Sequence, residues 1–263
     1  MIMTANYHTH TTRCKHAVGS EREYIETAIK KGFKTLGFSD HSPQPFTGGL
    51  GDVIRMRLYQ AEEYTDTLLK LREEYKDSID ILIGYEVEYY RDAFGVLLNE
   101  LRKYPLDYLI LGQHYAPDEF RGFYAGEYTT NENRLKAYVD MTIEGMMTGE
   151  FLYLAHPDLI NYHGNDGAYV RQMTRLIQNA VDLNIPLEIN LFGMVDNRQY
   201  PSGRFFSLAS EMGAKFVLGC DAHYPDMIKQ PEEIKGFDTF LEKNHIAEED
   251  IISEFSFPLS PEK

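Results

Sequence analysis

The sequence predicts an α/β barrel in which parallel strands alternate with helices. Short apolar or β-branched runs alternate along the chain with longer segments of helical period, which is the pattern of strands joined by crossover helices. Polar side chains able to bind metal stand at the ends of these runs. No linker rich in Pro, Gly or Ser divides the 263 residues, and 43% of them are hydrophobic, enough for one large core. We therefore expect a single domain over residues 1–263.

Seven apolar runs are expected to form the strands. They cover residues 2–8, 35–41, 80–89, 107–115, 151–157, 186–192 and 215–223. The helices expected between and after them cover residues 20–32, 54–76, 93–103, 132–148, 167–184, 203–212 and 231–243. The first helix has the clearest ends, because Ser20 and Glu23 form a capping-box pattern and Gly32 follows the last turn.

Six of the seven expected strands end in a histidine, a carboxylate or both, and the remaining one ends in Glu188 and Asn190. In a parallel βα barrel the C-terminal ends of the strands and the loops after them form the active face, so these residues should converge there. The groups at the other six strands are His8, His10, His16, Asp40, His41, Glu86, Glu88, His114, His156, Asp158, Asp221 and His223.

This set predicts a metal centre. Neutral imidazole suits zinc, iron and manganese, and a carboxylate can bridge two ions. Each ion takes three or four protein ligands, so about ten ligand contacts imply two or three divalent ions. On an extended strand alternate side chains point the same way, so His8 and His10 should both face the barrel mouth. The expected ligands are His8, His10, His16, His41, Glu86, His114, His156, Asp221 and His223.

The composition and motifs of the sequence disfavour several other classes of function. The formal charge of −15, from 41 acidic and 26 basic residues, disfavours nucleic acid as a partner, although a small anion could bind where local cations outweigh the overall charge. Two cysteines form no disulfide framework, and neither a long apolar run nor a signal peptide is present. We expect a cytoplasmic protein without a membrane partner. A serine triad is disfavoured because no Gly-x-Ser-x-Gly elbow occurs.

The runs HTHTTRCKHA, SDH, GYEVE, GQHY, AHPD and GCDAH occur in this order from His8 to His223. Together they resemble the polymerase and histidinol phosphatase (PHP) superfamily, and within it the histidinol-phosphate phosphatases. The ordered set is specific for the superfamily, whereas the narrower assignment rests on chain length and on the YPS-containing segment before the last strand. The resemblance implies a distorted TIM-like (β/α)7 barrel that holds three divalent ions, Zn, Mn or Fe. It also implies hydrolysis of L-histidinol phosphate to L-histidinol and phosphate, by water activated between two ions.

The resemblance also distributes the ligands among the ions. The first ion would be held by His8, His10, Glu86 and Asp221, the second by Glu86, His114 and His156, and the third by His16, His41 and His223. Asp221 or His223 would donate a proton to the leaving alkoxide.

The substrate clamp departs from the pattern of the family. The family often has a Gly-Leu-Arg run after the sixth strand, whereas this chain reads NLFGMVDNRQYPSGR, with Arg198 displaced. We expect Arg198 to grip the phosphate with its planar guanidinium, and Arg204 and Arg13 are further candidates. Glu88, Asp158 and nearby tyrosines are candidates to receive the cationic end of the substrate.

Three alternatives share part of this pattern. The protein could be a phosphoesterase for another small phosphate ester, a nucleotide or an oligonucleotide end. It could be a metal-binding scaffold without activity, although no ligand position looks lost. An amidohydrolase on a similar barrel often uses a bridging carboxylated lysine, but the third strand here ends in Glu86.

Overall fold

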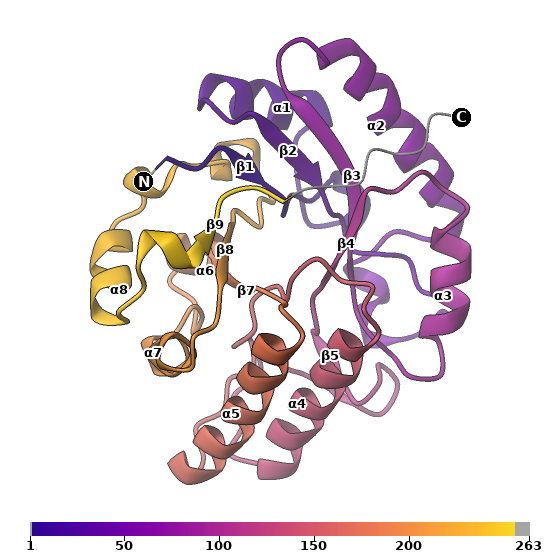
Figure 1. Ribbon diagram of the computed structural model, residues 1–263. Helices are drawn as coiled ribbons and strands as arrows, with labels where there is room; N and C mark the ends of the chain where they lie inside the picture. The colour runs from indigo at the N-terminus through magenta and orange to yellow at the C-terminus, as the bar shows by residue number, and fades with distance from the viewer. Residues whose placement is uncertain (1, 256–263) are drawn as a thin grey trace.

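The structure is a computed structural model that describes residues 2–255. A parallel sheet lies at the centre and helices cover its outer face (Figure 1). The parallel strands are β1 (Ala5–Asn6), β2 (Thr35–Phe38), β3 (Asp80–Val87), β4 (Tyr108–Leu111), β7 (Leu187–Asn190), β8 (Phe216–Gly219) and β9 (Ile251–Ile252). The first four are neighbours in chain order, as are the last three, which is the arrangement predicted for a βα barrel.

Single-residue bridges join the two groups of strands. Leu154 pairs in parallel with Leu111 of β4 on one side and with Leu187 of β7 on the other. Thr9, just after β1, pairs in parallel with Ala222, just after β8, and the His10 amide donates to the Ala222 carbonyl over 3.0 Å. The sheet therefore curls back on itself, which confirms the predicted distorted barrel. These bridges matter for function because they hold the ends of distant strands together at one rim.

The helices are α1 (Glu21–Lys30), α2 (Ala61–Tyr75), α3 (Phe94–Leu101), α4 (Glu132–Met147), α5 (Asp166–Asp182), α6 (Leu191–Val195), α7 (Gly203–Glu211) and α8 (Phe237–Lys243). α1 begins at the predicted capping box, in which the Ser20 side chain accepts from the Glu23 amide and the Glu23 carboxylate accepts from the Ser20 amide. A short antiparallel hairpin of β5 (Tyr115–Ala116) and β6 (Phe123–Tyr124) follows β4.

Several predicted boundaries were wrong. Residues 151–157 lie between β4 and β7 as expected, but only Leu154 makes β-bridges there, because His156 adopts a left-handed φ of 28° that turns the chain. The helix predicted over 54–76 begins only at Ala61, after a turn that buries Arg55. The helix predicted over 231–243 is confined to α8, because Gly236 has a φ of 87°. The sequence did not reveal α6, β9 or the hairpin.

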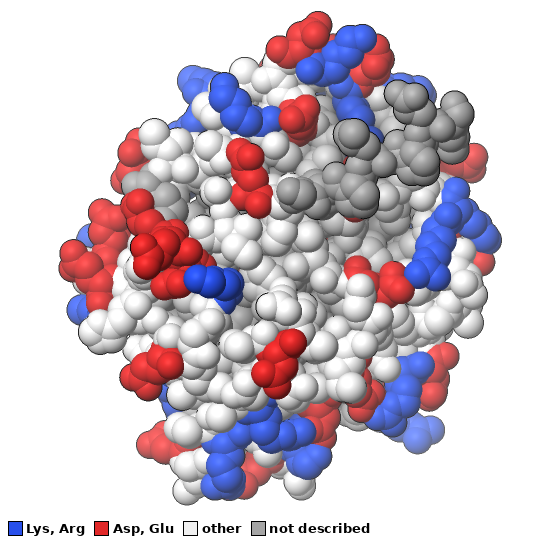
Figure 2. All heavy atoms as spheres, in the orientation of Figure 1, with Lys and Arg blue, Asp and Glu red and all other residues white. Residues whose placement is uncertain are grey.

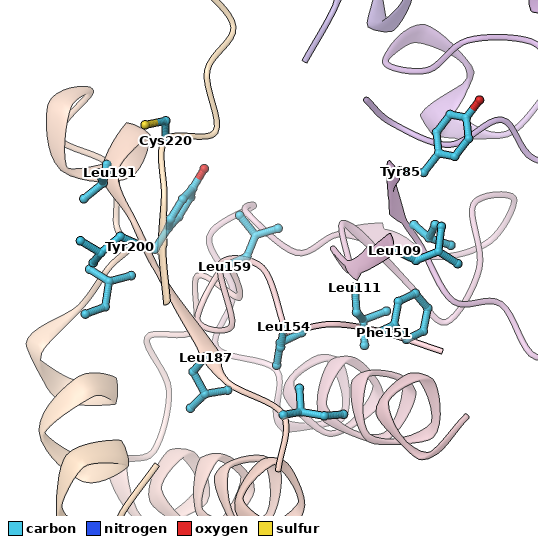
Figure 3. Close-up of a cluster of buried hydrophobic side chains, with 14 of the residues drawn as sticks. Tyr85, Leu109, Leu111, Phe151, Leu154, Leu159, Leu187, Leu191, Tyr200 and Cys220 are labelled. Atoms are coloured by element: carbon cyan, nitrogen blue, oxygen red, sulfur yellow. The ribbon is translucent and has the colours of Figure 1, made fainter. Parts of the chain in front are cut away.

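The largest cluster of buried apolar side chains ties the two halves of the sheet together. Figure 3 shows part of it, with Leu111 of β4, Phe151, Leu154 and Leu187 of β7 drawn as sticks. Leu111, Leu154 and Leu187 are fully buried, and they are also the residues that form the bridges. Side-chain packing and backbone hydrogen bonding therefore both join β4 to β7 through Leu154.

On the face seen in Figure 2, the acidic and basic side chains of the described residues lie mostly around the edge, and a group of acidic side chains lies on the left of the view. Within residues 2–255 no helix has both the length and the apolar character needed to cross a membrane. A cytoplasmic location stays a prediction.

We expect Leu154→Ala to lower the free energy of unfolding by about 2–5 kcal/mol, because it leaves a cavity where the two groups of strands meet. Urea unfolding of the metal-free protein, followed by circular dichroism, measures this change. Val96→Ala is the control, since Val96 on α3 is 56% exposed, and its effect should stay within about 0.5 kcal/mol. Equal effects of the two variants would contradict a special role of Leu154.

Candidate metal centre and active site

Nine donor side chains from six separate places in the sequence meet at the rim formed by the C-terminal ends of the strands. Eight of them are buried, and only His16 is exposed. The nine are His8, His10, His16, His41, Glu86, His114, His156, Asp221 and His223, the same residues that the sequence predicted as ligands. Their roles as ligands stay predictions, but the structure brings them together.

Four donor atoms enclose one small space. Nε2 of His8 and Nε2 of His10 lie 3.5 Å and 3.1 Å from Oδ1 of Asp221. Both nitrogens also lie 3.6 Å from Oε2 of Glu86. Atoms bound about 2.1 Å from a tetrahedral ion are about 3.4 Å apart, so these four atoms already have the spacing of one coordination shell.

The other donors form two further groups around Glu86. Oε1 of Glu86 lies 2.6 Å from Nε2 of His156 and 3.7 Å from Nε2 of His114. His16, His41 and His223 form a second group, in which one donor atom of each residue lies within 4.8 Å of the others. Because Glu86 contacts several of the groups, its carboxylate is placed to bridge two ions.

The donors fit divalent ions by a further test. Nε2 of His8, Nε2 of His10 and Oε2 of Glu86 are buried and make no hydrogen bond within the described part of the chain. A buried polar atom left without a partner costs about 1–3 kcal/mol. Imidazole nitrogens and carboxylate oxygens in this arrangement are ligands for zinc, manganese or iron. A bound ion would therefore satisfy atoms that the protein alone leaves unpaired.

The electrostatics of the site also favour positive charge. Burial alone would lower the pKa of His8, but the carboxylates of Glu188 and Asp221 raise that pKa to about 10. Burial would likewise raise the pKa of Glu86, yet neighbouring imidazoles, His41 first among them, hold it well below its usual value. The carboxylates thus stay ionised inside the protein, where a cation neutralises them.

The backbone is shaped to present these groups. His156 and Asp221 both have left-handed φ angles, 28° and 47°, which are uncommon outside glycine. A Cβ atom at Gly112 would lie 1.9 Å from Oε1 of Glu86, so only glycine leaves room for this carboxylate. Left-handed turns at His156 and Asp221, and a glycine at position 112, therefore allow the donor side chains to point into the site.

Glu188 on β7 is a functional candidate that the sequence placed at a strand end without giving it a role. It is fully buried, and its Oε1 lies 2.7 Å from Nδ1 of His8. Its Oε2 accepts from the His156 amide and from the Asn190 side chain, each over 2.9 Å. A carboxylate that accepts from the far nitrogen of a metal-binding histidine fixes the tautomer and direction of the ring. The period of two that places Glu188 and Asn190 on one face of the strand was the available signal.

A pocket of about 400 Å³ opens beside the donor cluster. Among the described residues that line it, Arg198 is the only arginine or lysine. The guanidinium of Arg198 lies 4.2 Å above the ring of Phe192, and its Nε donates to Asp196 over 2.9 Å. The other walls are mostly aromatic. They include Tyr115, Tyr124, Phe192, Tyr200 and Tyr224.

Four predicted substrate-binding residues, Arg13, Arg204, Glu88 and Asp158, are not among the described residues that line this pocket. Arg13 is paired with Glu21 and Glu63, and Arg204 is paired with Asp166 on the outer surface. Glu88 is also absent from the described lining, and a different set of contacts accounts for it below. The proposal that these side chains touch the substrate therefore has no support from the structure.

Comparison with known proteins agrees with this geometry. The family description "PHP domain" matches residues 6–191, which include the donors from His8 to His156. The chain belongs to the PHP domain family. A relative from Deinococcus radiodurans, named "Probable histidinol-phosphatase", is 27% identical over 248 residues, covering 87% of this chain and 93% of the relative.

Two solved structures share the fold of this PHP protein. HisK of Listeria monocytogenes has a TM-score of 0.72 at 19% identity, over 89% of this chain and 99% of that one. The histidinol phosphate phosphatase of Lactococcus lactis has a TM-score of 0.69 at 19% identity, over 93% of this chain and 95% of that one. That second protein was solved with zinc, L-histidinol and phosphate. Both comparisons confirm the barrel fold.

We expect Glu188→Gln to weaken the binding of zinc or manganese about 10- to 100-fold, because His8 loses the charged partner that orients its ring. Competition with a chromophoric chelator measures the dissociation constant. Glu211→Gln, at an exposed position at the end of α7, removes a carboxylate far from the donors and should change nothing. Unchanged affinity in both variants would exclude a role for Glu188 in the metal centre.

Proposed function

We propose that the protein is a metal-dependent phosphatase that hydrolyses L-histidinol phosphate to L-histidinol and phosphate. The observation that carries this proposal is one pocket in which a cluster of buried metal-binding side chains adjoins a single arginine. The names of the relatives support the same reaction, and the Lactococcus lactis protein was solved with both products.

The nine donor side chains would hold divalent ions, three of them if the pattern of the family applies. We propose His8, His10, Glu86 and Asp221 for the first ion. Glu86, His114 and His156 would hold the second, and His16, His41 and His223 the third. The ions would supply charge neutralisation for phosphate oxygens and activation of water for attack on phosphorus. Zinc, manganese and iron all suit these ligands.

Arg198 is the proposed phosphate clamp. Its guanidinium donates a hydrogen bond to Asp196 and lies over the ring of Phe192, and these contacts orient it in the absence of substrate. A planar guanidinium can donate two parallel hydrogen bonds to phosphate oxygens, which lysine cannot do. Positive charge at these oxygens stabilises the transition state of phosphoryl transfer.

The departing alkoxide needs a proton. Asp221 and His223 both line the pocket in which the leaving oxygen would lie. Such general acid catalysis contributes about 10²- to 10⁴-fold in rate. We propose Asp221 or His223 for this role.

The imidazole end of the substrate would meet aromatic side chains. Asp158 accepts from the Ser202 amide over 2.7 Å, and neither it nor Glu88 is among the described residues that line the pocket. Tyr115, Tyr124 and Tyr200 do line it, and rings of this kind bind a planar cation by stacking and by cation–π attraction. Of the predicted candidates, we therefore propose the tyrosines for binding this end.

We expect the purified protein, supplied with manganese or zinc, to release phosphate from L-histidinol phosphate with a kcat/KM of about 10⁴ M⁻¹s⁻¹ or more. The comparison substrates are p-nitrophenyl phosphate, nucleoside monophosphates and a short oligonucleotide. Each should be hydrolysed far more slowly. A faster rate with a nucleotide would favour the alternative of a PHP phosphoesterase with another substrate. Equally slow release from all of them would exclude histidinol phosphate as the substrate.

We expect Arg198→Ala to lower kcat/KM at least 100-fold, because phosphate loses the only arginine or lysine among the described residues of the pocket lining. Steady-state kinetics with L-histidinol phosphate measure the change. Arg204→Ala is the matched control, since Arg204 pairs with Asp166 outside the pocket and should leave the kinetics unchanged. If both variants keep the wild-type kcat/KM, Arg198 is not the clamp.

A further inference from the structure

Arg55 is one of the largest fully buried side chains, and neither the sequence nor the proposed reaction explains it. It is only 2% exposed, although its guanidinium is always charged. Its Nη2 donates to Oε2 of Glu88 over 2.9 Å and also to Oε1 of Glu119. One buried cation thus faces two buried carboxylates.

The network continues from Glu88 into the metal centre. Oε1 of Glu88 accepts from the His114 amide over 3.2 Å and lies 3.4 Å from Nδ1 of the same histidine. The opposite ring nitrogen of His114, Nε2, lies 3.7 Å from Oε1 of Glu86. Arg55, Glu88 and His114 therefore form a continuous chain that ends at the carboxylate shared by the proposed ions.

Backbone contacts fix the outer end of this chain. Oε2 of Glu119 accepts from the Gly51 amide over 3.0 Å, and the Glu119 carbonyl accepts from the Leu50 amide over 3.1 Å. A Cβ atom at Gly51 would lie 1.6 Å from Nη2 of Arg55, so the guanidinium packs directly on the backbone. The position of the Arg55 guanidinium is thus fixed by the segment at residues 50–51 and by Glu119.

Stability alone does not account for such a triad. Burying an ion pair carries a large desolvation cost, and apolar residues of similar volume often leave a protein equally or more stable. A carboxylate that contacts the far nitrogen of a metal-binding histidine can instead have a functional role, because it determines which ring nitrogen carries the proton.

We propose that Arg55 is a positioning residue for the metal centre. It holds Glu88 Oε1 3.4 Å from Nδ1 of His114, a buried nitrogen that makes no hydrogen bond within the described residues. From there Glu88 would accept the proton of Nδ1 once His114 binds an ion, which would leave the lone pair of Nε2 for that ion. This inference rests on the proposed function only in taking His114 as a ligand, and it does not depend on the identity of the substrate.

The test compares Arg55→Met with Arg72→Met in full-length protein. Arg72 is the matched control, because it pairs with Asp107 and lines a different pocket, so the same chemical change occurs away from the donors. Zinc affinity and stoichiometry are measured by chelator competition and elemental analysis. We expect Arg55→Met to bind zinc about 10- to 100-fold more weakly at one site, with Arg72→Met unchanged.

A second readout follows the proton itself. In zinc-loaded protein labelled with ¹⁵N-histidine, two-bond ¹H–¹⁵N spectra distinguish the two tautomers, and His114→Asn identifies the signal of His114. The wild type should show the proton on Nδ1, and Arg55→Met should lose or mix this pattern. Arg55→Lys, which keeps a cation without the planar fork, should restore part of the affinity, and it replaces Arg55→Met if that variant does not fold.

The outcomes separate this inference from the proposed function. Wild-type zinc affinity together with an unchanged His114 pattern in the Arg55 variants would overturn the role of Arg55, while phosphate release by the wild type would still support the reaction. Zinc binding that is unchanged by His114→Asn would remove His114 from the ligands, and the role of Arg55 with it.

Discussion

The structure depends most on one buried carboxylate, that of Glu86. An ionised acid inside a protein must be compensated, and here the compensation comes from histidines carried by other strands. Each of those strands must therefore end at a position from which its histidine can contact one of the two carboxylate oxygens of Glu86. The glycine at position 112, the left-handed turns at His156 and Asp221, and the barrel closure at Thr9 all serve this convergence.

Much of the barrel could be predicted because its signals are local. An apolar run predicts a strand, and a capping box predicts the start of a helix, as at Ser20. The errors lie where distant residues decide the local conformation. Residues 151–157 read as a strand, yet His156 turns the chain in order to meet Glu86. The early part of the helix predicted over 54–76 is displaced by the buried contacts of Arg55.

The nine donor side chains could be predicted from the sequence, whereas the residues that orient them could not. Histidines and acids at successive strand ends form a pattern in the sequence itself, and the structure brings all of these donors together. Glu119 carries no such pattern, and Glu188 lies at a strand end without a predicted role, because a carboxylate that orients a ligand looks like any other acid until its partner is known. Two of the charged candidates for substrate binding stay predictions without structural support for a related reason. Arg13 and Arg204 found partners on the surface, which spacing in the sequence does not reveal.

The bridge between Thr9 and Ala222 joins the first motif of the chain to its last one. His8 and His10 flank one side of this bridge, and Asp221 and His223 flank the other. The shell proposed for the first ion is therefore incomplete until the segment after β8 has docked beside the segment after β1. During synthesis on the ribosome, the N-terminal histidines emerge long before their carboxylate partner. Capture of the proposed first ion would then require this closure, since a chain that ends before Asp221 has only part of the proposed shell.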